Sequence, residues 1–232
     1  MKKIITIVFY ALITNLSYGQ SKIDSVLVSD VKFKNSKFDN PHAGSGFLLK
    51  YKNKTYGITA KHVLFFAKTD SMKSISFGDY LKSWSFSSKT SPNKKVLAGK
   101  LLNEAPNELL EMPPKGDWLI FEIKGSIPKD IAVYSLRDKP LNIGENVRFL
   151  GYPYKTTKPI NIKGTYVGLT KDKNLRLDVP KGTYNGCSGG PVIDSEGKIV
   201  GLVSMGYFNE KDNKQVFEPA SLDYFKEVIN KK

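Results

Sequence analysis

The residues best suited to chemistry lie in a glycine-rich segment, G-C-S-G-G-P at residues 186–191. Acyl transfer requires a nucleophile, a base that takes its proton, and backbone N–H donors that meet the oxyanion of the tetrahedral intermediate. Glycine reaches the positive φ angles that let neighbouring amides converge on one point. Ser188 is therefore a candidate nucleophile, although a glycine-rich β-turn without a catalytic role would have the same composition.

The candidate bases are the two histidines, His42 and His62, and both precede Ser188. This order excludes the α/β-hydrolases, although residues 186–190 match their G-x-S-x-G motif, because their histidine follows the serine. A papain-type site with Cys187 as nucleophile would also need a later histidine. His62 directly follows a predicted strand, where an imidazole with a pKa of about 6.5 could act as general base. His42 lies instead in the turn-like segment 40–44.

An acid that could orient the base stands at Asp117, at the start of the strongly apolar segment 118–123. A carboxylate there could accept a hydrogen bond from the second imidazole nitrogen, fix its tautomer and stabilise the imidazolium. Taken alone, Asp117 could equally be the last residue of a loop. The order His62, Asp117, Ser188 favours the catalytic interpretation, because the three roles require one another.

The elements that must position these residues are short β-type segments separated by turn residues, which predicts an all-β fold. Residues 84–94 and 103–116 are predicted loops, and residues 124–129 interrupt the apolar pattern. Ser221 is a predicted N-cap of a C-terminal helix, because Leu222, Phe225, Val228 and Ile229 have helical spacing. The predicted strands are 46–51, 55–59, 74–77, 95–101, 118–123, 132–136, 146–150, 164–169, 175–179, 199–204 and 216–218.

Composition limits the classes of protein that the chain can represent. With 232 residues, 40% of them hydrophobic, the chain can bury a substantial core. Its formal net charge is +14, but lysines are scattered through the chain and arginine is rare, so no arginine cluster indicates specific nucleic-acid recognition. Cys187 is the only cysteine in the sequence, which excludes an internal disulfide.

The N-terminus has the pattern of a secretory signal peptide. Lys2 and Lys3 precede an apolar run at residues 4–16, and small residues follow at Ser17 and Gly19. The run is short for a bilayer-spanning helix of about 20 residues. We expect residues 1–19 to be removed, and the remaining chain to be secreted or periplasmic in a bacterium, with no membrane span.

Three segments together resemble the motifs of the trypsin/chymotrypsin-like serine peptidases, in that family's order: T-A-K-H-V at 59–63, D-W-L-I at 117–120 and G-C-S-G-G-P at 186–191. G-Y-P at 151–153 also resembles bacterial members. The resemblance implies two antiparallel β-barrels of the chymotrypsin type with the site between them. Residues 20–125 would form the N-terminal barrel, and residues 126–232 the C-terminal barrel and terminal helix, in one catalytic unit.

The resemblance also implies the roles of individual residues. His62 would be the general base, Asp117 its orienting acid and Ser188 the nucleophile, and the amides of Gly186 and Ser188 would form the oxyanion hole. The implied substrate-binding residues are Gly182, Thr183, Ser204, Met205 and Gly206. No metal or other cofactor is expected.

One position departs from the family pattern. Animal zymogens of the family have an aspartate directly before the nucleophile, which pairs with a newly cut N-terminus, whereas this chain has Cys187. We therefore expect activity without N-terminal cleavage beyond signal removal, and a packing role for Cys187. No acid occupies the position of the pocket floor, which disfavours cleavage after lysine or arginine and favours a small or apolar residue.

The sequence thus predicts an exported trypsin-like serine endopeptidase that hydrolyses peptide bonds through an acyl-enzyme, with an extended protein or peptide as substrate. The main alternative is a non-enzymatic peptide-binding module on the same scaffold. A further alternative is polyanion binding through the basic surface, which would weaken steeply with salt. The oligomeric state does not follow from the sequence.

Overall fold

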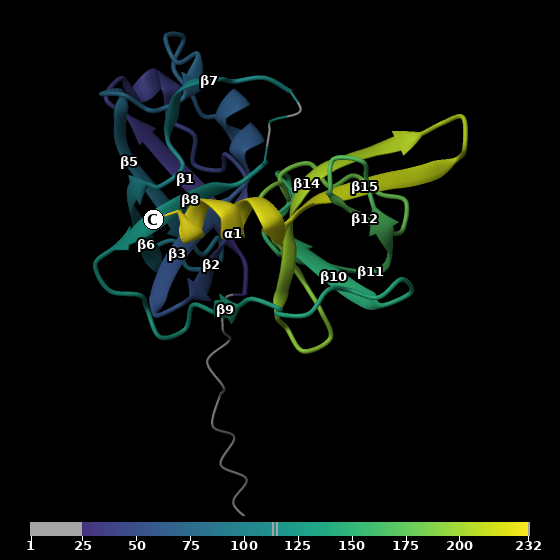
Figure 1. Cartoon of the computed structure of the whole chain (residues 1–232). Coiled ribbons are helices and arrows are strands. Elements are labelled where there is room, and N and C mark those ends of the chain that lie inside the picture. Colours follow the sequence, from purple (N-terminus) through teal and green to yellow (C-terminus); the bar gives the residue numbers. More distant parts are fainter. Residues whose placement is uncertain (1–24, 113, 115, 232) are drawn as a thin grey trace, which may run out of the picture.

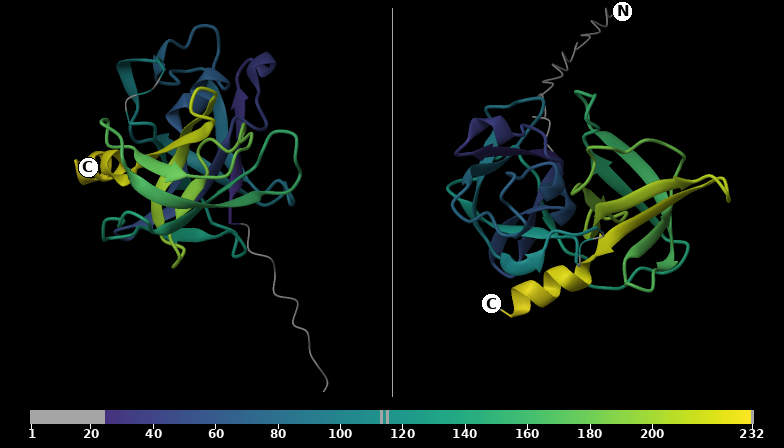
Figure 2. Two further views of the ribbon diagram at one scale, coloured as in Figure 1. Left: turned by 90° about the vertical axis from the view of Figure 1, so that its right-hand side faces the viewer. Right: turned by 90° about the horizontal axis from the view of Figure 1, so that it is seen from above.

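The structure, a computed structural model, describes residues 25–112, 114 and 116–231 (Figure 1). The predicted signal peptide, residues 1–19, lies outside the described residues. Two β-sheets lie side by side, and a C-terminal helix runs from the second sheet onto the first (Figures 1 and 2). This arrangement confirms the predicted all-β fold with two barrels and a terminal helix.

The first sheet is a closed barrel with one added strand. Its strands are β1 (Leu27–Phe33), β2 (Ser45–Tyr51), β3 (Lys54–Thr59), β5 (Leu81–Ser87), β6 (Lys95–Leu101), β8 (Leu119–Lys124) and β9 (Val133–Ser135). The order is β1-β5-β6-β8-β3-β2-β9, and a further pairing of β1 with β2 closes the barrel. Strand β9 pairs parallel to β2, whereas the other pairings are antiparallel.

The second sheet has the order β12-β11-β10-β13-β14-β15 and nearly closes into a barrel. Its strands are β10 (Asn146–Gly151), β11 (Ile160–Leu169), β12 (Leu175–Asp178), β13 (Pro191–Ile193), β14 (Ile199–Asn209) and β15 (Lys214–Ser221). The β14–β15 hairpin extends beyond the body of the barrel (Figure 1). The smaller elements are η1 (Ser36–Phe38), η2 (Lys61–Phe65), and the two-stranded sheet of β4 (Ser74–Ile75) and β7 (Ala105–Leu109).

The C-terminal helix α1 (Leu222–Asn230) packs on the first barrel although the chain enters it from the second. The ring of Phe225 lies 5.7 Å from that of Tyr51, 5.9 Å from that of Tyr56 and 5.5 Å from that of Trp118. Aromatic rings at such separations bury a large apolar area, and the rings of Tyr51 and Tyr56 meet Phe225 edge to face. The helix therefore holds the two barrels together and covers the strand that follows Asp117.

The helix prediction is confirmed, since α1 begins directly after its N-cap, Ser221, although the Ser221 side chain makes no capping hydrogen bond. Two loop predictions are wrong in part. Residues 84–87 belong to β5, and β7 lies within the predicted loop 103–116. Strands β1 and β5 were not predicted. In β5, serines are buried by their position in a closed barrel, so the polar composition that indicated a loop reflects tight packing instead.

Candidate active site

His62 and Asp117 meet because β3 and β8 are paired strands of the first barrel. Thr59, the last residue of β3, lies opposite Leu119, the first residue of β8. The chain turns into η2 after β3, which carries His62, while Asp117 stands two residues before β8. The strand register therefore brings the two side chains to the same end of the barrel.

Asp117 holds His62 by both of its carboxylate oxygens. The backbone N–H of His62 donates to Oδ1 at 2.8 Å, and Nδ1 of the ring lies 2.7 Å from Oδ2. The hydroxyl of Ser204 also donates to Oδ2. Both residues are buried, with 7% of His62 and 5% of Asp117 exposed, so water screens the pair little. Nδ1 is thereby held toward the carboxylate, and Nε2 is the ring nitrogen left to accept a proton.

Two opposed effects set the pKa of the His62 imidazole. Burial of the ring lowers the pKa of His62, but the negative charge of Asp117 and its hydrogen bond raise it more, and the net result is a pKa above the ordinary 6.5. A base with a raised pKa holds a proton more firmly once it has received it. The pair is therefore suited to accept a proton from a hydroxyl.

The segment around Asp117 is fixed by a residue that the sequence did not indicate. The side chain of Asn103 donates to the carbonyl of Trp118 at 2.6 Å and accepts from the amide of Ile120 at 3.0 Å. Gly116 has a φ of 54° and packs so closely on Tyr224 that a Cβ would lie 2.1 Å from the ring. The sequence could not indicate these contacts, because Asn103 lies in a segment predicted to be a loop and meets residues 118–120 only in the folded barrel.

The segment 184–190 forms two successive turns. The amide of Cys187 donates to the carbonyl of Tyr184 at 2.9 Å, and the amide of Gly190 donates to the carbonyl of Cys187 at 2.8 Å. The third residue of each turn is a glycine with positive φ, 95° at Gly186 and 85° at Gly189, as a type II turn requires. Ser188 is the second residue of the second turn.

This segment is docked directly against the first barrel. The amide of Ser45 donates to the carbonyl of Ser188 at 2.8 Å. Gly189 approaches β3 so closely that a Cβ would lie 2.2 Å from Oγ1 of Thr59 and 2.7 Å from the amide nitrogen of Ala60. Ser188 therefore lies beside the start of η2, which carries His62.

The geometry leaves one catalytic contact unmade. Across the described residues, the Ser188 hydroxyl makes no hydrogen bond to the His62 ring. Such bonds are often long in a free enzyme and tighten when substrate binds. In the same part of the chain, no group accepts a hydrogen bond from the amide of Gly186 or of Ser188, so both amides remain available as donors.

Ser188 opens onto a pocket of about 250 Å³ between β14, β15 and the segment that precedes the turns. The lining residues are Gly182, Thr183, Tyr184, Asn185, Ser188, Val203, Ser204, Gly206, Tyr207, Phe208, Gln215 and Phe217. Four of the five predicted substrate-binding residues are in this set, and Met205 is not. No acidic side chain is among these lining residues.

Cys187 is a residue of the turns, and His42 lies close to them. Burial, and then the charge of Lys89, lower the pKa of His42 to about 4, and its ring packs edge to face on Tyr154 at 4.9 Å. The Cys187 side chain is fully buried against Gly151, and burial raises the pKa of its thiol to about 12. A thiol that stays protonated is a poor nucleophile, which leaves Ser188 as the candidate nucleophile of this segment.

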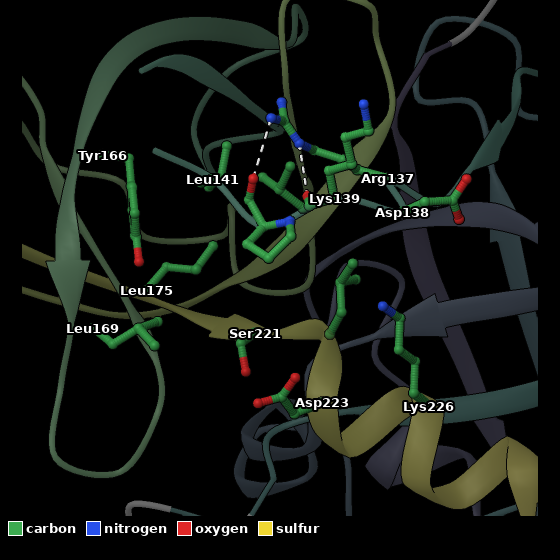
Figure 3. Close-up of a pocket in the computed structure, with 13 residues that line it drawn as sticks. Arg137, Asp138, Lys139, Leu141, Tyr166, Leu169, Leu175, Ser221, Asp223 and Lys226 are labelled. Carbon is green, nitrogen blue, oxygen red and sulfur yellow. Dashed lines mark hydrogen bonds between the residues drawn. The ribbon is translucent and has the colours of Figure 1, made fainter. Parts of the chain in front are cut away.

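A second pocket lies between the start of α1, β11 and β12 (Figure 3). Its Arg137 bonds to Glu145 and to Asp194. Its guanidinium also donates to the carbonyls of Lys139 at 2.9 Å and Pro140 at 3.3 Å, which Figure 3 shows as dashed lines. The arginine is thus occupied by protein groups, and the pocket contains none of the predicted site residues.

Within the described part of the chain, no group of three or more His, Cys, Asp or Glu side chains is arranged to hold a metal ion. No helix among these residues has the length and apolar character needed to cross a bilayer.

Comparison with known proteins agrees with the fold. The sequence profile of the trypsin-like peptidase domain matches residues 44–202. No curated protein sequence matches the chain. Among solved structures, the serine endoprotease from Yersinia pestis is similar, with a TM-score of 0.60 and 15% sequence identity over 91% of this chain. The match spans 63% of that protein, and at this identity it establishes the chymotrypsin-like fold alone.

Proposed function

The chain belongs to the trypsin-like peptidase family, and we propose that it is an exported serine endopeptidase with His62, Asp117 and Ser188 as its catalytic triad. The observation that carries the proposal is the buried pair of His62 and Asp117, joined at 2.7 Å and held beside the turns that contain Ser188. A structural histidine would not need a carboxylate that also fixes its backbone amide.

In the acylation step, Oγ of Ser188 bonds to the carbonyl carbon of the substrate while Nε2 of His62 takes the hydroxyl proton. The amides of Gly186 and Ser188 donate to the oxyanion that forms. His62 then gives the proton to the leaving amine, and the C–N bond breaks. The products of this step are an ester on Ser188 and a free amine.

Deacylation repeats the sequence with water as nucleophile. His62 takes a proton from the water, whose oxygen bonds to the ester carbon. The Ser188–carbon bond then breaks, and the proton returns to Ser188. Asp117 would stabilise the imidazolium in both steps, because its two oxygens accept hydrogen bonds from the backbone N–H and from Nδ1 of His62.

The substrate would bind in extended form along β14. Strand β13 pairs with β14 only as far as Leu202, so one edge of residues 204–206 faces the pocket beside Ser188. An exposed strand edge can take up a peptide as an additional strand. The absence of acidic groups among the pocket residues disfavours lysine and arginine at the cleavage position.

Export is proposed from the N-terminal pattern of residues 1–19 alone, and it implies a secreted or periplasmic location. A chain with a single, fully buried cysteine suits an oxidising compartment, because it offers no exposed thiol.

The test is reaction with a fluorophosphonate probe and cleavage of casein. We expect the wild type to be labelled and to cleave, Ser188→Ala to do neither, and Ser135→Ala, an exposed serine on β9, to match the wild type. Labelling of Ser188→Ala at the wild-type rate would refute the assignment of the nucleophile. A wild type that binds casein without labelling or cleavage would instead support the binding module.

A further inference from the structure

Ser45 lies at the junction of the two barrels and the turns that carry Ser188. It is the first residue of β2 and is fully buried. Its hydroxyl donates to the carbonyl of Gly186 at 2.9 Å and accepts from the amide of Tyr152 at 2.9 Å. A hydroxyl has a single hydrogen to donate. Because the amide of Tyr152 is the donor in the second bond, the Ser45 hydroxyl donates its hydrogen to the carbonyl of Gly186.

The direction of the first oxyanion donor, the N–H of Gly186, is set by the peptide that joins Asn185 to Gly186. In a planar trans peptide the C=O and the N–H point in opposite directions. The carbonyl of Asn185 accepts from the amide of Tyr154 at 3.1 Å, on the side of β10. The N–H of Gly186 must therefore point away from Tyr154.

The next peptide, which joins Gly186 to Cys187, lies between the two oxyanion donors. Its carbonyl is held by the Ser45 hydroxyl, and its N–H donates to the carbonyl of Tyr184 at 2.9 Å. With both ends bonded, this peptide cannot rotate without breaking two buried hydrogen bonds. The orientation of the Gly186 amide on one side and of the Ser188 amide on the other depends on it.

Ser45 also fixes the peptide that follows the nucleophile. Its amide donates to the carbonyl of Ser188 at 2.8 Å, and the amide of Gly189, in the same peptide, donates to the carbonyl of Val203 at 2.8 Å. The carbonyl of Ser45 is in turn held by Thr59 at 2.7 Å. All the polar atoms of Ser45 are therefore bonded, two of them to the segment 186–188.

No carboxylate among the described residues bonds to the segment 184–190, and Cys187 within it is an uncharged, buried thiol. We propose that Ser45 is the positioning residue of the oxyanion hole, holding the amides of Gly186 and Ser188 in their donor orientation with a neutral hydroxyl. The proposal rests on the proposed function for its catalytic consequence, but the orientation of the two amides can be tested without activity.

The test compares Ser45→Ala with Ser88→Ala. Ser88 is also fully buried, and its hydroxyl also has two hydrogen bonds, one with the Thr90 hydroxyl at 3.0 Å and one from the amide of Ser91 at 3.2 Å, and neither involves the turns. Removing one oxyanion donor outright slows catalysis about 10²–10³-fold, so loosening both without removing either should slow it on the order of 10–100-fold. The measurements are the rate of fluorophosphonate labelling and the crystal structure of each variant.

We expect Ser45→Ala to label about 10–100-fold more slowly and its Gly186–Cys187 peptide to turn or become disordered, while Ser88→Ala stays within about threefold of the wild type. An unchanged loop in Ser45→Ala, wild-type labelling, or an equal loss in both variants would each overturn the proposal. If Ser45→Ala does not fold, Ser45→Cys decides by the same criteria, because a thiol is only a weak donor. A wild type that is not labelled counts against the proposed function alone, and the crystal structures still decide the role of Ser45.

Discussion

Replacing Asp117 with asparagine changes one atom of the site and should remove nearly all activity. The carboxylate accepts from the His62 backbone at 2.8 Å, faces Nδ1 at 2.7 Å, and accepts from the Ser204 hydroxyl. An asparagine can keep its oxygen toward the His62 backbone, but its NH₂ group then faces Nδ1. Because two N–H donors cannot bond to each other, the imidazole must give up its Nδ1 proton and carry it on Nε2 instead.

An imidazole protonated on Nε2 cannot accept the proton of Ser188. We therefore expect Asp117→Asn to lower kcat about 10⁴-fold, which corresponds to about 5.5 kcal/mol of lost transition-state stabilisation. Glu122→Gln on β8, the strand that follows Asp117, changes an exposed carboxylate outside the site; it is the matched control and should leave kcat unchanged. The assay is the labelling rate with a fluorophosphonate, checked by casein cleavage.

The pH dependence gives a second measurement on the same variant. In the wild type the labelling rate should rise with pH through the pKa of His62, which lies above 6.5 because the charge of Asp117 outweighs the effect of burial. In Asp117→Asn the charge is gone and burial remains, so the inflection should move to lower pH. Residual activity above about 10% of the wild type, or an inflection at higher pH, would refute the assigned role of Asp117.

Two further predictions concern the turns around Ser188. Gly189→Ala should lower the free energy of unfolding by about 3 kcal/mol or more, because Gly189 has a φ of 85° and a Cβ there would overlap with Thr59. The control Gly197→Ala, at a φ of 78° but in open space, should lower it by only about 1–2 kcal/mol. Urea unfolding measures both losses, and equal losses would contradict the close docking of Gly189. Cys187, whose thiol pKa burial raises to about 12, should react with a thiol reagent only after unfolding, and fast reaction of the native protein at neutral pH would contradict its buried position.

The chemistry of the site was the part most open to sequence analysis. The order of His62, Asp117 and Ser188 excludes other hydrolase classes, and the glycines at 186 and 189 indicate turns with positive φ, because both follow from residue type and spacing. The C-terminal helix was equally accessible, since its apolar residues repeat with the helical period. The turns and the helix are local features that neighbouring residues determine, and the order of the three candidate residues is read directly along the chain.

The support of the site was decided by tertiary structure alone. Ser45 and Gly186 are separated by 141 positions in the chain, and Asp117 and Ser204 by 87, yet each pair shares a buried hydrogen bond. Strand β5 was not predicted, because Ser85 and Ser87 are buried only once the first barrel closes. The sequence by itself thus determined which groups could react. Strand register and barrel closure decided which groups hold them, because hydrogen bonds between distant segments leave no periodic pattern along the chain.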